Sequence, residues 1–198
     1  MSTTTESFKK LLTEDRNSRT MDLDVLSTEE LVKRIQNEDL DVAKAVAACA
    51  PDIAKAVDLA TERLAKGGRM IYFGAGTSGR LGVLDATECS PTFGVDSHTI
   101  QAYIAGGKEA MFQAFENAED STELGKTDAE SADITGKDVV VGITASGRTP
   151  YVVGALRKAQ ECGAATIAII NNPQSELEKI CDVTIAALVG PEALTGST

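Results

Sequence analysis

The stretch that most constrains the fold runs from Met70 to Pro91, MIYFGAGTSGRLGVLDATECSP. An apolar run of strand length, residues 70 to 73, leads into a loop of glycine, threonine and serine and then into a pattern of helical period. The stretch therefore predicts a strand, a tight turn and the start of a helix. Gly74, Gly76 and Gly79 would let the backbone approach a ligand closely, while the free N–H groups and the dipole at a helix start attract anions. We expect a small anionic ligand, in the first place a phosphorylated one.

The composition limits the class of partner. The chain has 198 residues, and 42% of them are hydrophobic, which suffices for one domain with a helical appendage. A net charge of −11 disfavours nucleic acid, and the 4% aromatic content without tryptophan offers little for stacking bases. No run approaches the roughly 18 apolar residues of a membrane span. The first residues lack the apolar core of a signal peptide, so we expect a cytoplasmic protein that binds neither nucleic acid nor membrane.

The cysteines indicate neither a zinc site nor a redox pair. Cys49, Cys89, Cys162 and Cys181 lie far apart, form no CxxC pair and have only His98 as a possible nitrogen ligand. Reduced thiols in a reducing compartment are the simpler interpretation. Because the chain has no GxSxG serine, His98 is expected to be structural rather than part of a hydrolase triad. We therefore expect no metal.

The first third of the chain is predicted to be helical. Residues 1 to 26 are polar and resemble an extended arm. The motif STEE places Ser27 as a helix cap, and a second helical stretch begins near Asp41. Pro51 suits the first turn of a third helix, which a glycine pair closes. We expect residues 1 to 66 to form an N-terminal arm and helical segment.

Beyond Arg69, apolar runs of strand length alternate with helical patterns. The expected strands are residues 70 to 73, 99 to 105, 138 to 144, 165 to 170 and 183 to 188. The expected later helices are residues 108 to 132, 151 to 162 and 175 to 180. This alternation predicts an α/β fold: a three-layer αβα sandwich with a five-stranded parallel sheet, preceded by the N-terminal helices. Residues 67 to 198 would form this domain, with its ligand beyond the carboxyl ends of the strands.

The first glycine loop, residues 74 to 79, has the form G-x-G-x-x-G, which by itself is a weak sign of dinucleotide binding. A dinucleotide fold also needs an acidic residue at the end of its second strand. The nearest candidate, Asp96, comes before that strand, so a nicotinamide cofactor is the minor interpretation. The glycines could instead serve only a tight turn. Thr77 and Ser78, placed together at the helix entrance, favour ligand binding.

A second loop, TASGRTP from Thr144 to Pro150, repeats the arrangement of hydroxyls, glycine and helix start. Its three hydroxyls and successive N–H groups can surround a phosphate without a lysine, and Arg148 can bind a phosphate or a carboxylate. Thr149 could simply cap the helix, but this leaves Thr144 and Ser146 unexplained. No GxxxxGK[ST] motif is present, so a nucleotide P-loop is excluded.

Two such loops at one edge of a sheet suggest a phosphosugar, with phosphate on one loop and sugar hydroxyls on the other. The candidate binding residues are Gly76, Thr77, Ser78, Gly79, Thr144, Ser146, Gly147, Arg148 and Thr149. Arg80 is expected either to bind the ligand or to pair at the surface, and Glu116 is expected to lie at the surface.

The loops GAGTSGR and TASGRTP together resemble the sugar isomerase (SIS) domain family. The segments DATECSPTFG, IAGG, AEDS and GPEALTGS resemble its N-acetylmuramic acid 6-phosphate etherase branch. The resemblance runs from about Leu26 to Thr198. This branch is similar in sequence to the animal glucokinase regulatory protein, which binds phosphosugars. Since the family signature continues past GPEALTGST, we expect a chain truncated before a C-terminal helical region.

The resemblance implies a lyase that needs no cofactor. Such an enzyme cleaves the lactyl ether of N-acetylmuramic acid 6-phosphate to N-acetylglucosamine 6-phosphate and D-lactate, in the recycling of cell-wall sugars. Two residues match the family's catalytic glutamates by motif: Glu88 in ATECSP and Glu119 in NAEDS. We assign Glu88 as the proton donor to the leaving oxygen and Glu119 as the base at C2, a division of roles that the sequence leaves open.

The resemblance also implies a homodimer, since SIS domains usually pair and the N-terminal helices carry apolar stripes that need cover. Two alternatives remain. One is an aldose–ketose isomerase acting on sugar phosphates, which also needs a base at C2. The other is a phosphosugar-binding regulatory protein, which would bind its ligand without turnover.

Overall fold

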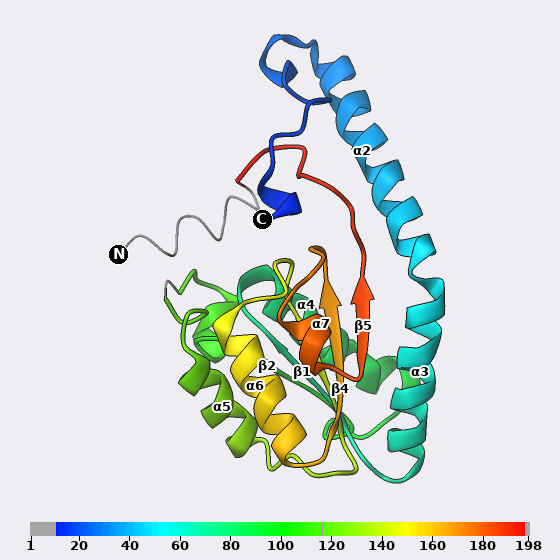
Figure 1. Ribbon diagram of the computed structural model, residues 1–198, viewed down its shortest axis with the longest axis vertical. Helices are drawn as coiled ribbons and strands as arrows, with labels where there is room; N and C mark the ends of the chain where they lie inside the picture. The colour runs from blue at the N-terminus through cyan, green and yellow to red at the C-terminus, as the bar shows by residue number, and fades with distance from the viewer. Residues whose placement is uncertain (1–10, 116, 197–198) are drawn as a thin grey trace.

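Five parallel strands form the centre of the protein in the computed structural model, which describes residues 11–115 and 117–196 (Figure 1). The strands are β1 (Met70–Gly74), β2 (Ile100–Ile104), β3 (Val139–Ile143), β4 (Ala165–Ile170) and β5 (Val183–Ala186). They pair in the order β2-β1-β3-β4-β5, and every pair is parallel. The predicted five-stranded parallel sheet is confirmed, with strand ends that differ by one or two residues from those expected.

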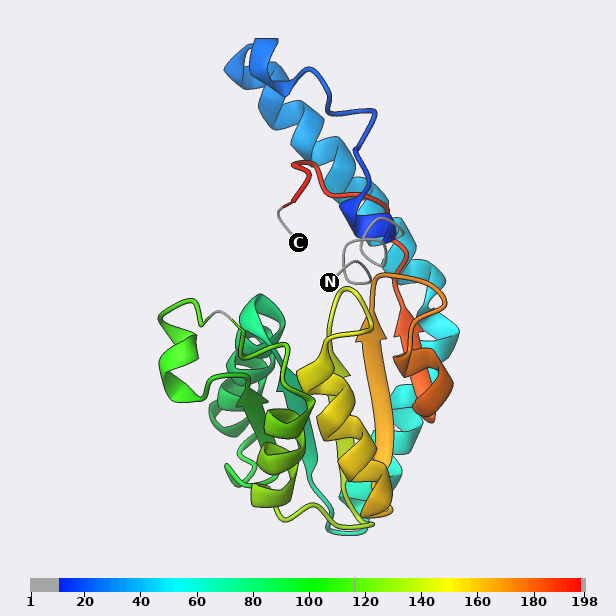
Figure 2. The same ribbon diagram turned by 60° about the vertical axis from the view of Figure 1, so that its left-hand side comes forward.

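Helices cover both faces of this sheet. They are α2 (Thr28–Ala48), α3 (Ala50–Ala65), α4 (Gly76–Phe93), α5 (Thr122–Ser131), α6 (Pro150–Glu161) and α7 (Leu177–Ile180), with short 3-10 turns η1 (Leu12–Glu14), η2 (Leu23–Val25) and η3 (Lys108–Met111). α3 and α4 lie on one face, and α5, α6 and α7 lie on the other (Figures 1 and 2). The predicted three-layer sandwich is confirmed. Within the described residues, no helix is both long enough and apolar enough to cross a membrane.

The core is split into two layers by the sheet. In the central strand β3, Val139 and Val141 pack with Ala56 of α3, whereas Val140 packs in the layer formed by α5 and α6. Because both faces of a parallel sheet are covered, its strands read as continuous apolar runs, and this made them visible in the sequence. Gly142 allows α6 to approach, since a Cβ there would lie 2.5 Å from Leu156 Cδ1.

The predicted start of the first long helix is confirmed. The Ser27 hydroxyl accepts a hydrogen bond from the Glu30 N–H, while the Glu30 carboxylate accepts one from the Ser27 N–H, which completes a capping box. The separate helix expected near Asp41 is wrong. No glycine or proline interrupts the sequence there, so α2 continues unbroken to Ala48 and projects beyond the sheet (Figure 1). Pro51 lies in the first turn of α3, as expected.

The long helix expected from residues 108 to 132 is also wrong. The chain forms the short turn η3, then a loop, and a new helix only at α5. Asn117 in the loop has φ of 67°, which a continuing helix cannot accommodate, and Ser121 caps α5 by accepting a bond from the Leu124 N–H at 3.1 Å. Glu119 therefore lies on a loop, and Glu116 lies outside the described residues.

The described part of the expected arm, residues 11 to 26, packs against the protein rather than extending from it. Asn17 is buried and donates to Glu38 of α2 at 2.7 Å and to the Pro191 carbonyl at 3.5 Å. The segment lies beside the last described residues (Figures 1 and 2). Residues 1–10 lie outside the described part. The division at residue 66 stays a prediction, although α3, which precedes that point, covers the sheet.

Candidate functional site

Two loops leave the sheet where its strand order reverses. β1 and β3 are neighbours, with Gly74 paired to Ile143, but β1 leads to β2 on one side and β3 leads to β4 on the other. In open α/β sheets, ligands bind outside the carboxyl ends of the strands at this reversal. The loops that follow β1 and β3 carry the predicted binding residues, so the fold places both groups at one edge.

The glycines of the first loop have different roles. A Cβ on Gly79 would lie 2.6 Å from Ile104 Cγ1, and one on Gly74 would lie 2.7 Å from the Gly79 nitrogen. These two glycines therefore let α4 pack tightly against the ends of β1 and β2. Gly76 has φ of +53° with open space around it, so its role is to allow the left-handed turn into α4 beside a pocket.

Thr77 and Ser78 lie in the first turn of α4, as predicted. Thr77 is exposed and Ser78 is half-buried. Within the described residues, neither hydroxyl has a hydrogen-bond partner, and the Ala75 side chain at the helix start provides no cap. The N–H groups and hydroxyls of this turn are thus available to an anionic ligand.

The second loop gathers its three hydroxyls into one cluster. Thr144 Oγ1 is 2.6 Å from Thr149 Oγ1 and 3.2 Å from Ser146 Oγ, and Thr144 is buried. The Arg148 N–H donates to Ser146 Oγ at 3.2 Å. Thr149 makes no side-chain cap for α6, so helix capping does not account for it. We call Thr144, Ser146 and Thr149 the hydroxyl cluster.

Gly147 holds the second loop against the segment that follows β4. It has φ of +68°, and a Cβ there would lie 2.4 Å from Ser175 Cβ. Its carbonyl accepts a bond from the Leu177 N–H at 3.3 Å. No larger residue fits this position without displacing the loop.

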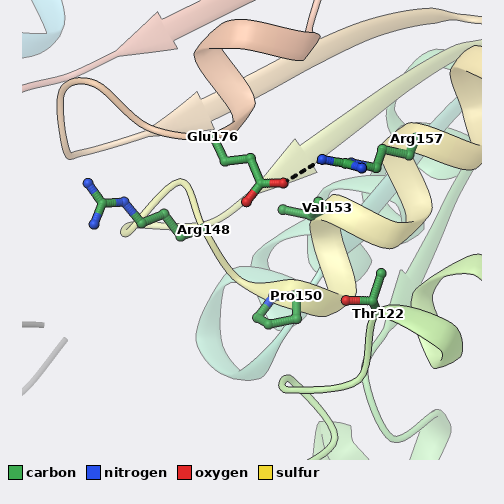
Figure 3. A pocket seen from close by; sticks show the side chains of 6 residues that line it. All are labelled: Thr122, Arg148, Pro150, Val153, Arg157 and Glu176. Carbon is green, nitrogen blue, oxygen red and sulfur yellow. Dashed lines mark hydrogen bonds and ion pairs between the residues drawn. The ribbon is translucent and has the colours of Figure 1, made fainter. Parts of the chain in front are cut away.

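The two arginines near the loops differ in their surroundings. Arg80 donates to the carbonyls of Met111 at 3.1 Å and Gln113 at 3.2 Å, so it anchors the loop after η3. The Arg148 guanidinium has no partner among the described residues. It lines a pocket of about 220 Å³ and points away from the Arg157–Glu176 ion pair there (Figure 3).

Glu119 lies beside the first loop. It lines a pocket of about 260 Å³ together with Ala75, Gly76, Arg80, Ala105, Ala110, Gln113, Ala114 and Phe115. Its backbone carbonyl accepts a hydrogen bond of 3.0 Å from the Tyr151 N–H, in the first turn of α6. Glu119 thus lines a pocket together with residues of the first loop, while its backbone is fixed to the helix that follows the second loop.

Glu88 is not brought to this pocket within one chain. It is exposed on α4, twelve positions after Gly76. At 1.5 Å per residue, it lies about 18 Å along the helix axis from the first loop. The structure therefore brings Glu119 and Gly76 together but places Glu88 elsewhere on the surface.

The contacts that hold Glu119 in place were not anticipated from the sequence. Tyr151 is fully buried, and its hydroxyl donates to the Asp128 carboxylate at 2.7 Å, which links α6 to α5. Burial, together with that hydrogen bond, raises the pKa of Tyr151 above its ordinary value, so the hydroxyl stays protonated. Gly125 and Gly154 let the two helices touch; these glycines, one in each helix, were the available sequence signal.

The part of the chain that the structure describes contains no metal-binding cluster. Among the described residues, no group of three or more His, Cys, Asp and Glu side chains could hold a metal ion. The four cysteines are free thiols.

Comparison with known proteins gives relatives over almost the whole chain. It is 56% identical over 188 residues to N-acetylmuramic acid 6-phosphate etherase 2 of Vibrio cholerae, covering 95% of this chain and 61% of that protein. It is 53% identical over 191 residues to N-acetylmuramic acid 6-phosphate etherase of Clostridium beijerinckii, covering 96% of this chain and 63% of that protein. The chain thus spans about three fifths of the length of these curated relatives. The resemblance inferred from the motifs is confirmed.

Solved structures share the fold at low sequence identity. A phosphoheptose isomerase from Francisella tularensis superposes with a TM-score of 0.62 at 18% identity, covering 82% of this chain and 86% of that one. The phosphoheptose isomerase from Neisseria gonorrhoeae gives a TM-score of 0.58 at 18% identity, covering 80% and 85%. The model of the glucokinase regulatory protein N-terminal SIS domain matches residues 52–160, more than half of the chain. The chain therefore belongs to the family of the glucokinase regulatory protein N-terminal SIS domain.

Proposed function

We propose that the chain binds a phosphorylated amino sugar and carries the chemistry of an N-acetylmuramic acid 6-phosphate etherase. The observation that carries this proposal is the pocket lined by both Glu119 and Gly76 where the strand order reverses. The pocket places a carboxylate residue beside the first loop, where the sugar would lie, as a base acting at C2 requires. The relatives named as etherases support the same reaction.

In this proposal the phosphate binds at the second loop. Two of the three hydroxyl protons of the cluster make bonds within it, which leaves one to donate to a ligand, and the cluster lies at the start of α6, where the helix dipole favours an anion. Arg148 adds a guanidinium with no partner among the described residues, which can pair with phosphate oxygens. The sugar would extend toward the first loop, with Thr77, Ser78 and the backbone of Gly76 around its hydroxyls, whereas Gly79 is buried and serves the packing of α4.

The reaction proceeds by elimination and then hydration, with acid–base groups alone. In the open-chain aldehyde, the carbonyl at C1 acidifies the C2 proton. Glu119 removes that proton while a second carboxyl group protonates the lactyl oxygen at C3. The C3–O bond breaks, leaving a C2=C3 double bond and D-lactate. Water then adds at C3 and gives its proton to the second carboxylate, while Glu119 returns a proton to C2. The product is N-acetylglucosamine 6-phosphate.

The position of Glu88 argues for a homodimer with shared sites. Leu81, Leu84 and Glu88 follow one another at spacings of three and four along α4, which places them on one helix face. Leu81 is 55% exposed and Leu84 is 59% exposed. A second copy that covered these leucines would bury Glu88 in the interface. The proton donor would then be Glu88 of the partner subunit, because within one chain it lies too far from Glu119.

The reducing environment that four free cysteines favour supports a cytoplasmic location for this reaction.

The test is release of D-lactate from N-acetylmuramic acid 6-phosphate by the purified chain. We expect release by the wild type and a loss of at least about a hundredfold in kcat for Glu119→Gln, because the amide cannot accept the C2 proton. Glu109→Gln is the matched control, since Glu109 is an exposed glutamate of η3 that does not line the pocket. Undiminished release by Glu119→Gln would contradict the assignment.

Two other outcomes would select the alternatives. Binding of the phosphosugar without any lactate release would support a regulatory protein that only binds its ligand. Interconversion of glucosamine 6-phosphate or fructose 6-phosphate with the matching ketose or aldose would support an isomerase.

A further inference from the structure

A buried asparagine beyond the proposed ligand contacts ties two distant segments to each other. Asn172 follows β4 and is 1% exposed. Its Nδ2 donates to the Ala145 carbonyl at 2.9 Å and to Thr13 Oγ1 at 3.1 Å. Its Oδ1 accepts from the Leu12 N–H at 2.6 Å and from the Thr13 N–H at 3.4 Å. One side chain therefore binds both η1 and the second loop.

The contact on the loop side falls at the centre of the hydroxyl cluster. Ala145 lies between Thr144 and Ser146, and its carbonyl also accepts a bond of 3.0 Å from the Asn171 N–H. Two donors on one carbonyl fix the orientation of that peptide group. Because the peptide leads directly into Ser146, its orientation fixes the backbone from which the Ser146 side chain extends.

The contact on the N-terminal side has its own anchor. Thr13 is buried, and its carbonyl accepts a bond from the Glu192 N–H at 3.5 Å. Segment 11–14 is thus held against the body of the protein by Asn172 and the chain near residue 192. An apolar side chain at position 172 could fill the same space but could not accept from the Leu12 and Thr13 N–H groups, and it would remove the second donor to the Ala145 carbonyl; a buried polar group left unpaired is costly.

We propose that Asn172 is a positioning residue that couples segment 11–14 to the phosphosugar loop, so that the hydroxyl cluster takes its binding orientation only when this segment is seated. The identity of the ligand rests on the proposed function. The coupling is reciprocal: a ligand that orders the loop must also stabilise the seated segment.

Binding of N-acetylglucosamine 6-phosphate, measured by calorimetry, tests the positioning role. We expect Asn172→Ala and Asn172→Asp to raise Kd about tenfold, since the aspartate keeps the acceptor but removes the donor to Ala145. Thr13→Val removes only the N-terminal acceptor, and we expect about a threefold rise.

The matched control is Thr166→Val. Thr166 is also fully buried on β4, near its other end, and its hydroxyl bonds to Asp182 at 3.0 Å. The variant should lose stability but bind N-acetylglucosamine 6-phosphate with the wild-type Kd. An equal rise in Kd for Thr166→Val would reduce the effect at Asn172 to general destabilisation and overturn the proposal.

Amide hydrogen exchange separates this inference from the proposed function. With N-acetylglucosamine 6-phosphate bound, exchange at Leu12 and Thr13 should slow, and in free Thr13→Val, exchange at residues 146 to 148 should speed up. A wild type that does not bind the sugar phosphate would overturn the proposed function, but faster loop exchange in free Thr13→Val would still support the coupling. Unchanged loop exchange in that variant, or an Asn172→Asp variant with wild-type Kd, would overturn the coupling itself.

Discussion

The Ser146 hydroxyl is the most informative single atom of the proposed phosphate site. It accepts a bond from the Arg148 N–H and shares a second bond with Thr144. A hydroxyl can keep these partners and turn its remaining capacity toward an oxygen of a ligand. Ser146 is linked to Thr149 through Thr144, so a substitution at Ser146 also affects the hydrogen bonding of the other two hydroxyls.

Ser146→Ala is expected to weaken binding of N-acetylglucosamine 6-phosphate by about 1 to 3 kcal/mol, because one hydrogen bond to a charged group is lost. Calorimetric titration measures the change. The exposed Ser97→Ala serves as the control and should bind like the wild type. Unchanged affinity in Ser146→Ala would place the phosphate elsewhere.

Asp138 plays a purely structural part at the opposite edge of the sheet. It is 2% exposed, pairs with Arg69 at 2.8 Å and accepts a bond from the Thr135 N–H at 2.8 Å. Burial alone would raise the pKa of Asp138. The hydrogen bonds that Asp138 accepts from Arg69 and from the Thr135 N–H, together with the charge of Arg69, outweigh burial and lower the pKa below its ordinary value. The carboxylate therefore favours the folded state when ionised.

The contribution of Asp138 to the stability of the fold depends on pH. The stabilisation by Asp138 is complete above the ordinary aspartate pKa of about 3.9 and is lost as the pH falls through the lower folded value. Asp138→Asn should lower the free energy of unfolding by about 3 to 5 kcal/mol at pH 7, since Arg69 loses its charged partner and keeps only the carbonyls of Ala132 and Asp133. The unfolding free energy of this variant should also fall less steeply than that of the wild type as the pH is lowered. Urea unfolding between pH 3 and 7, compared with the exposed Asp58→Asn, checks both; a fall as steep as in the wild type would contradict the role.

The α5–α6 pair is the element on which the position of Glu119 depends. The two helices touch through backbone at Gly125 and Gly154, and Tyr151 of α6 holds both Asp128 of α5 and the Glu119 carbonyl. Such close contact needs glycine in each helix because any side chain would separate them. The loop that carries Glu119 is thus located by a helix–helix contact.

Gly154→Ala tests this dependence. The new Cβ would lie 2.1 Å from the Thr122 carbonyl oxygen, so α5 and α6 must move apart. We expect a loss of about 1 to 3 kcal/mol in the free energy of unfolding, together with reduced lactate release. Gly136→Ala is the control, because its nearest neighbour would be 3.5 Å away. Chemical denaturation and the lactate assay give both readouts; wild-type stability in Gly154→Ala would show that the helices can adjust.

For the whole molecule, the proposed function raises the question of how two glutamates on separate surfaces would act together. Glu119 lines the pocket, and Glu88 lies on the exposed face of α4 beside Leu81 and Leu84. A symmetric dimer through this face presents the same helix from both copies. Each site would then combine Glu119 of one chain with Glu88 of the partner subunit.

Mixing two inactive variants tests the shared site. Glu88→Gln and Glu119→Gln should each release almost no lactate, but random exchange of their subunits should restore about a quarter of wild-type activity, since half of the dimers are mixed and each holds one intact site. Leu84→Glu should give a monomer in sedimentation and prevent the rescue. Persistent inactivity of an exchanged mixture, shown by mass to contain mixed dimers, would contradict a shared site.

The sequence predicted those parts of the protein that depend on neighbouring residues. Buried parallel strands appear as apolar runs, and the capping box at Ser27 is set by residues three positions apart. The two loops were found because glycine and hydroxyl residues follow a strand directly. The polar stretch 108 to 132 was misread as a helix, since its high helical propensity does not reveal that Asn117 adopts positive φ and that Ser121 starts a new helix.

By itself, the sequence determined the order of strands and helices, the two loops and the family, because these follow from local patterns and motifs. Only the tertiary structure decided which of the predicted residues meet. Strand order brought the loops after β1 and β3 to one edge, and the contact of α6 with the Glu119 carbonyl holds that residue in the pocket that Gly76 also lines. The rigid length of α4 kept Glu88 away. Such pairings depend on contacts between residues far apart in the chain, which no local pattern encodes.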